Sequence, residues 1–148
     1  MGECTLCREL KEGKCVVYKD KYCFCAVAKW PIKKGHILVM PIRHVTDVSD
    51  LDGEESKAIF QAIGLLQKVL PKIYKIDAIV IQNPMEWRTE GHIHFHVLPS
   101  AGAIRHLFSK YEGTPFRADV PDEEMDKMAE EVIEAIDSFY GIKKVKSK

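Results

Sequence analysis

Short apolar runs along the chain alternate with longer segments in which apolar residues recur at the spacing of a helix. Four runs have the length of strands and are bounded by charged or turn-forming residues; they cover residues 15–18, 22–27, 36–40 and 78–81. The charged turn at 19–21, between the first two runs, predicts a β-hairpin. The fourth run is followed by Asn83 and Pro84, which both favour leaving a strand.

Two longer segments carry apolar residues at intervals of three and four, which is the period of an amphipathic helix. The first spans 52–75 and has Glu54 and Glu55 in its first turn, where the helix dipole favours acidic side chains. Pro71 is expected either to bend this helix or to end it. The second spans 121–141, and its apolar stripe consists of Met125, Met128, Val132, Ile136 and Phe139.

A fifth strand is expected from His92 to Pro99, where polar and apolar residues alternate strictly, whereas residues 100–118 show no clean period. No repeat or second domain boundary is evident, and 148 residues that are 46% hydrophobic suffice for one core. We therefore predict a single domain over 1–148 of the α+β class. It combines a mostly antiparallel five-stranded sheet, one long helix and a C-terminal helix. The basic tail at 143–148 is expected to fray.

Charge and composition exclude several function classes. The 22 basic and 22 acidic residues cancel, so no overall field draws the chain to nucleic acid or to a membrane. No apolar run approaches the roughly 18 residues that cross a bilayer, and the first residues lack a signal-peptide pattern, so we expect a cytoplasmic protein. In that reducing compartment, the pair Cys4 and Cys7 among five cysteines favours metal or redox chemistry over a structural disulfide.

Three of the six histidines fall within five residues, as His92, His94 and His96. In a strand these side chains share one face, and α-carbons about 6.6 Å apart let neighbouring rings serve one ligand. Three interpretations are open: a solvent-exposed strand face on which histidine occurs by chance, a metal site formed by all three histidines, and a catalytic site. Zinc takes bonds of about 2.1 Å that converge tetrahedrally, which ligands along a flat strand fit poorly.

Catalysis at phosphorus is favoured by the chemistry of imidazole. A neutral ring can attack phosphorus if one nitrogen is deprotonated and a hydrogen bond fixes the other. A flanking imidazolium could donate to a phosphate oxygen and stabilise the charge of the transition state. The three histidines can therefore form a phosphoryl-transfer site.

The sequence resembles the histidine triad (HIT) family. The run from His92 to Leu98 matches the family's signature completely, and the segment from Gly35 and His36 to Pro41 looks like the one before its long helix. The resemblance covers roughly residues 4–99. It implies a HIT-like fold and a homodimer whose sheet is continuous across the subunits.

The resemblance implies a nucleotidyl hydrolase or transferase that acts on the α-phosphate of a nucleotide-like substrate. A dinucleoside polyphosphate and a nucleoside phosphoramidate are examples. His94 would become transiently nucleotidylated and His96 would contact the phosphate. His36 would form a hydrogen bond behind the triad, or else be a structural histidine near a turn.

A zinc knuckle at residues 1–10 is indicated by Cys4 and Cys7, whose spacing suits zinc but leaves two ligands to be found. Some branches of the family, including bacterial triad proteins and galactose-1-phosphate uridylyltransferases, look similar here. The resemblance implies a structural Zn²⁺ bound by Cys4, Cys7, His44 and His92. Reduced cysteines without a metal are the alternative.

Ala28 departs from the family's pattern, because members usually carry an aspartate or asparagine there that binds the ribose hydroxyls. An alanine side chain accepts no hydrogen bond. Either the ribose is held differently, for example through Lys29 or Trp30, or the substrate is not an ordinary nucleotide.

Three more residues are candidates for nucleotide or phosphate binding. Asn83 matches an asparagine that often contacts the ribose-phosphate, and Thr89 matches a hydroxyl at the leaving-group side. Arg88 is either a phosphate clamp or a solvated loop arginine, and neighbouring Trp87 either stacks on a base or packs. Two alternative functions remain open: a non-catalytic nucleotide-binding sensor or interaction protein, and a zinc-dependent hydrolase whose triad binds the metal.

Overall fold

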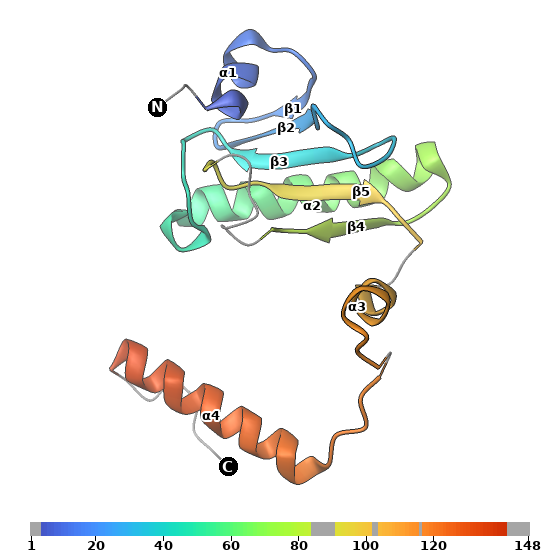
Figure 1. Ribbon diagram of the computed structural model, residues 1–148. Coiled ribbons are helices and arrows are strands. Elements are labelled where there is room, and N and C mark those ends of the chain that lie inside the picture. Colours follow the sequence, from blue (N-terminus) through green and yellow to red (C-terminus); the bar gives the residue numbers. More distant parts are fainter. Residues whose placement is uncertain (1–3, 84–90, 102–103, 116, 142–148) are drawn as a thin grey trace. The chain divides into compact units, whose positions relative to one another are not determined.

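The computed structural model describes residues 4–83, 91–101, 104–115 and 117–141 (Figure 1). The chain divides into two compact units, Met1–Ala101 and Gly102–Lys148, and each is described by itself. The single domain expected from the sequence stays a prediction, and the tail at 143–148 lies outside the described residues. None of the helices in the described parts of the chain combines the length and the apolar character that crossing a bilayer requires.

The first unit is built on an antiparallel sheet. Its elements in chain order are α1 (Thr5–Glu12), β1 (Val16–Lys19), β2 (Cys23–Val27), β3 (Ile37–Pro41), the 3-10 helix η1 (Val48–Asp50), α2 (Gly53–Tyr74), β4 (Ala78–Ile81) and β5 (Phe95–Pro99). The strand order is β1-β2-β3-β5-β4, and each neighbouring pair is antiparallel (Figure 1). The α+β class and the five-stranded sheet are therefore confirmed.

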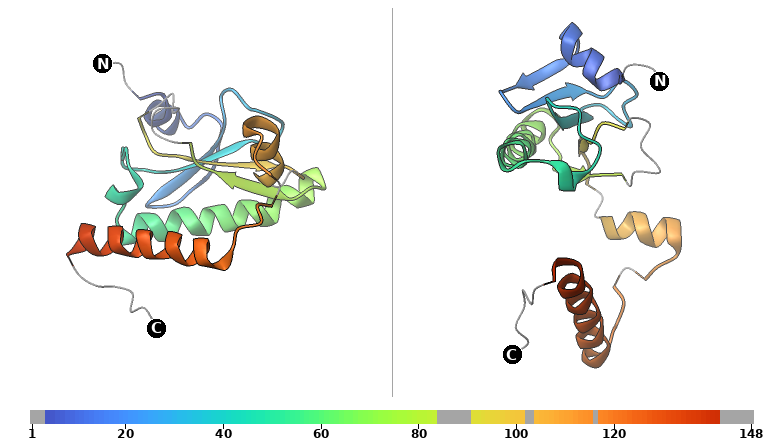
Figure 2. Two further views of the ribbon diagram at one scale, coloured as in Figure 1. Left: turned by 60° about the horizontal axis from the view of Figure 1, so that its bottom comes forward. Right: turned by 90° about the vertical axis from the view of Figure 1, so that its left-hand side faces the viewer.

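Strand alternation divides the core between the two faces of the sheet. Cys25 of β2 and Val39 of β3 pack with Ile59 and other buried residues of α2. Their neighbours Phe24 and Met40 belong to a second cluster, which also contains Leu6 of α1 and Leu38 of β3. Figure 2 shows α2 running along the sheet. The face with Leu38 is the one on which the candidate site lies.

The first turn of α2 fixes the segment that follows β3. Asp52 accepts a hydrogen bond from the Glu55 backbone N–H at 2.8 Å, and Glu55 accepts one from the Asp52 N–H at 3.0 Å, which forms a capping box. Nε and Nη2 of Arg43 donate to the two carboxylate oxygens of Glu55 at 2.9 and 2.7 Å. Bonding to Arg43 holds the pKa of the buried Glu55 carboxyl below its usual range. The chain directly before His44 is thereby tied to α2.

Gly35 is required by the close packing at the start of β3. Its φ is +83°, a left-handed conformation that side chains disfavour. A Cβ at this position would lie 2.5 Å from Cε2 of Tyr74 and 2.8 Å from Cγ of Pro99. The glycine therefore lets the chain pass between α2 and β5 directly before His36.

Several expectations about element boundaries need correction. The fifth strand begins at Phe95, not at His92, because the preceding residues bond to other parts of the backbone: the Ile93 N–H donates to the Val45 carbonyl at 2.6 Å. Pro71 does not end the long helix, which continues to Tyr74. The expected zinc knuckle contains an α-helix, α1, which the sequence analysis did not predict.

The second unit contains, within its described residues, α3 (Ile104–Glu112) and α4 (Asp122–Tyr140). The helix expected at 121–141 is confirmed: α4 has acidic residues in its first turn and ends at Gly141, whose φ is +67°. Helix α3 was not predicted, because it lies in the stretch without a clean period. In this unit the apolar stripe of α4 is exposed, for example at Val132.

Exchange of Glu55 for glutamine tests the anchor of α2. We expect Glu55→Gln to lower the free energy of unfolding by about 1–3 kcal/mol, because a charged, buried acceptor of two Arg43 hydrogen bonds is replaced by a neutral amide. The matched control is Glu54→Gln, in the same helical turn but exposed, for which we expect a change within about 0.5 kcal/mol. Urea unfolding of both variants measures the difference, and equal losses would show that the Arg43 pair is not an anchor.

Candidate active site and metal-binding group

β3 and β5 bring three histidines together on one face of the sheet. His96 of β5 is paired with Leu38 of β3, while its neighbour Phe95 packs towards α2. His36 lies directly before β3, and His94 directly before β5. His36 and His94 are buried, and His96 is half-buried.

A chain of hydrogen bonds sets the protons of His36 and His96. The Ile32 backbone N–H donates to Nδ1 of His36 at 3.2 Å, so neutral His36 carries its proton on Nε2. That Nε2 lies 2.8 Å from Nδ1 of His96, which therefore accepts. Neutral His96 then carries its proton on Nε2. Nδ2 of Asn83 lies 3.3 Å from this atom, and because an amide NH2 and an N–H are both donors, this tautomer requires the Asn83 amide to be turned so that its oxygen accepts. The ring of His96 thus presents its Nε2–H as a hydrogen-bond donor.

His94 has the opposite tautomer. Its Nδ1 lies 2.8 Å from the backbone carbonyl oxygen of His92, which can only accept, so Nδ1–H is the donor. In the neutral ring this leaves the lone pair on Nε2. The ring centroids of His94 and His96 are 4.9 Å apart in an edge-to-face arrangement. A nucleophilic nitrogen and an N–H donor therefore stand side by side.

The pKa values of the two flanking rings are lowered. Burial, with a contribution from nearby His94, lowers the pKa of His36. Burial and the charges of His94 and His36 lower the pKa of His96 to about 4. Both rings are therefore neutral at about pH 7, as the hydrogen-bond chain requires. The flanking imidazolium expected from the sequence is replaced by a neutral donor, although a bound phosphate would raise this pKa again.

His94 and His96 open on a pocket of about 100 Å³. Helix α1 contributes Thr5, Leu6 and Glu9 to its lining, and the segment after β2 contributes Ala28, Lys29 and Trp30. The three residues of α1 were not predicted to belong to the site. Their spacing of one and three residues, which places them on one side of a helix, is the signal that could have identified them once the helix was recognised.

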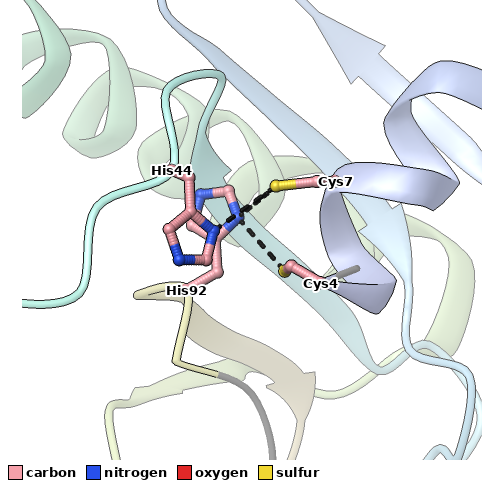
Figure 3. A group of neighbouring side chains, drawn as sticks. All are labelled: Cys4, Cys7, His44 and His92. Carbon is pink, nitrogen blue, oxygen red and sulfur yellow. Dashed lines mark hydrogen bonds between the residues drawn. The ribbon is translucent and has the colours of Figure 1, made fainter. Parts of the chain in front are cut away.

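His92 is directed away from this pocket, into a group with Cys4, Cys7 and His44 (Figure 3). Nδ1 of His92 lies 3.4 Å from Sγ of Cys7 and 3.8 Å from Sγ of Cys4, and Nδ1 of His44 lies 3.5 Å from Sγ of Cys7. Zinc bonds of about 2.3 Å to sulfur and 2.0–2.1 Å to nitrogen put tetrahedral S and N ligands roughly 3.5 Å apart. The four residues therefore fit a tetrahedral metal ion.

The backbone prepares His92 for such a role. Its Nε2–H donates to the Pro41 carbonyl at 3.0 Å, which leaves the Nδ1 lone pair directed at the sulfurs. Burial, with a contribution from the neighbouring His44, lowers the pKa of His92 to about 4, so the ring is neutral as a metal ligand must be. Among the residues that the structure describes, no candidate metal group includes His94 or His96.

The remaining candidates from the sequence are not all placed. Asn83 lies beside His96. Arg88, Thr89 and Trp87 lie outside the described residues, so their roles stay predictions.

Comparisons with known proteins identify relatives of this chain. The family model described as the HIT domain matches residues 10–103. The bis(5'-adenosyl)-triphosphatase of Saccharomyces cerevisiae is 34% identical over 88 residues, which are 57% of this chain and 43% of that enzyme. The matched part thus spans less than half of the yeast enzyme.

Solved structures share the fold. A HIT family protein from Bacillus anthracis superposes with a TM-score of 0.69 at 20% identity and covers 90% of this chain and 96% of its own. A Zn-bound histidine triad family protein from Mycobacterium smegmatis has a TM-score of 0.60 at 20% identity, with 92% and 96% covered. At these identities the likeness concerns the fold alone.

Proposed function

This chain belongs to the HIT domain family, and from that premise we propose that it is a nucleotidyl hydrolase or transferase that works through a covalent nucleotidyl-histidine at His94. The substrate would be a dinucleoside polyphosphate, a nucleoside phosphoramidate or a similar nucleotide. The activity of the yeast relative, a bis(5'-adenosyl)-triphosphatase, supports a nucleotide substrate. The observation that carries the proposal is the hydrogen bond from Nδ1 of His94 to the His92 carbonyl.

In the first step Nε2 of His94 attacks the α-phosphorus. A P–N bond forms as the P–O or P–N bond to the leaving group breaks, and the leaving group takes the bonding electron pair. Positive charge develops on the His94 ring, and the His92 carbonyl stabilises it through the Nδ1–H bond. The Nε2–H of His96 donates to a phosphate oxygen, where negative charge is concentrated.

In the second step an acceptor, water in the hydrolase, attacks the same phosphorus. The new P–O bond replaces the P–N bond, the electron pair returns to Nε2 of His94, and the proton of water is lost to solvent or to the product. His36 holds His96 in the required tautomer through both steps, because its Nε2–H keeps Nδ1 of His96 an acceptor.

Two further features of the proposal concern the assembly. We expect a homodimer, and β4, at the edge of the sheet, has a side on which another strand could pair. We also expect Zn²⁺ at the group formed by Cys4, Cys7, His44 and His92. The ion would cross-link α1 to the two segments that carry His44 and His92. A cytoplasmic location likewise stays a prediction.

Intact-mass measurement after incubation with a diadenosine polyphosphate or an adenosine phosphoramidate tests the covalent step. Quenching in base should reveal an adenylyl adduct, which His94→Ala should abolish, and turnover should fall by at least about 1,000-fold because the nucleophile is gone. The control is His106→Ala, an exposed histidine of the second unit, which should behave as the wild type. Binding without an adduct and without turnover, with His94→Ala indistinguishable from the wild type, would favour the non-catalytic alternative.

Metal analysis tests the zinc site. We expect about one zinc per chain, lost in Cys7→Ser and retained in Cys15→Ser, an exposed cysteine outside the group. Removal of zinc by a chelator should lower the melting temperature, since zinc at 1,000 times its Kd contributes about 4 kcal/mol of stability. His94→Ala and His96→Ala should keep their zinc. Loss of zinc in those two variants would instead indicate a metal bound by the triad.

A further inference from the structure

The pocket beside His94 contains a carboxylate. Glu9 is the one acidic side chain among the described residues that line it. It lies on α1, where Leu6, one turn earlier, is 5% exposed and packs in the same cluster as Ala28 and Leu38. This packing fixes the rotation of the helix, so the direction of Glu9 follows from it.

The chemistry of a carboxylate at this position indicates what it binds. Glu9 carries a negative charge and would repel a phosphate, so it is not a second phosphate ligand. A half-buried carboxylate accepts hydrogen bonds through two oxygens and can take hydroxyl donors from a ligand alongside bonds within the protein. Two neighbouring hydroxyl groups fit this pair of acceptors.

The segment after β2 also lines the pocket, and its side chains complement Glu9. Ala28 lines the pocket with a side chain that ends at Cβ and accepts no hydrogen bond. Trp30, also in the lining, is 73% exposed, with Nζ of Lys29 lying 5.0 Å from its ring centroid. An exposed indole is a surface on which a nucleobase can stack. The pocket thus offers different chemistry for phosphorus, sugar and base.

We propose that Glu9 binds the vicinal 2'- and 3'-hydroxyls of the ribose and so makes the site selective for ribonucleotides. The inference rests on the proposed function, because it takes the ligand to be a nucleotide whose phosphorus is at His94. Glu9 supplies from helix α1 the acceptor that Ala28, directly after β2, lacks. Because Cys4 and Cys7 lie at the start of that helix, the metal group and the sugar contact share one element.

The test is a double-mutant cycle in which one change is made in the protein and the other in the ligand. Titration calorimetry measures the affinity of each protein variant for adenosine 5'-monophosphate and for its 2'-deoxy analogue. We expect Glu9→Ala to weaken binding of the ribonucleotide roughly 10- to 100-fold, the range for hydrogen bonds to a charged group. The deoxy analogue should bind the wild type more weakly and should lose much less on the same substitution. Glu9→Gln, which keeps one oxygen acceptor, should be intermediate.

The matched control is Glu12→Ala, on the same helix but outside this pocket and partly exposed. It should bind both nucleotides as the wild type does, and all variants should retain the wild-type melting temperature and zinc content. Equal losses for the two nucleotides in Glu9→Ala, or no loss for either, would overturn the assignment. If the His94 adduct still forms in that case, the ribose contact is wrong while the proposed function stands; failure of the wild type to bind either nucleotide would instead refute both.

Discussion

The hydrogen bond between Nδ1 of His94 and the His92 carbonyl is the interaction on which the account of the site depends. A carbonyl can only accept, so this bond places the His94 proton on Nδ1 and the lone pair on Nε2. The Ile32 N–H gives His36 and His96 the opposite tautomer. It donates to Nδ1 of His36, whose Nε2–H donates to Nδ1 of His96, so both rings carry their proton on Nε2. Backbone groups of the fold thus assign a nucleophile and a donor.

Helix α1 connects the candidate metal-binding group with the pocket beside His94 and His96. Its start carries Cys4 and Cys7, which lie beside His44 and His92, while Thr5, Leu6 and Glu9 of the same helix line the pocket of His94 and His96. The side chain of His92 belongs to the metal-binding group, and its carbonyl oxygen accepts the hydrogen bond from His94 in the pocket. A metal ion bound there would therefore stabilise both the pocket wall and the acceptor that sets the tautomer of His94.

The periodic elements were predictable from the sequence because their signals are local. The strands and the two long helices follow from apolar spacing, and the HIT family follows from the run that begins at His92. The start of β5 was not predictable, since Ile93 bonds to distant Val45. Helix α1 is short, mostly polar and without a side-chain N-cap bond, and Leu6 is its one buried residue, so its position depends on tertiary packing. Glu9 could not be assigned to the pocket without that helix.

The most direct test of the account is the tautomeric state of each histidine, measured by NMR on protein with ¹⁵N-labelled imidazoles. At about pH 7 we predict a proton on Nδ1 of His94 and on Nε2 of both His36 and His96. His96 should stay neutral as the pH is lowered to about 5, because its pKa is about 4. A proton on Nε2 of His94, or protonation of His96 at about pH 6–7, would contradict the account.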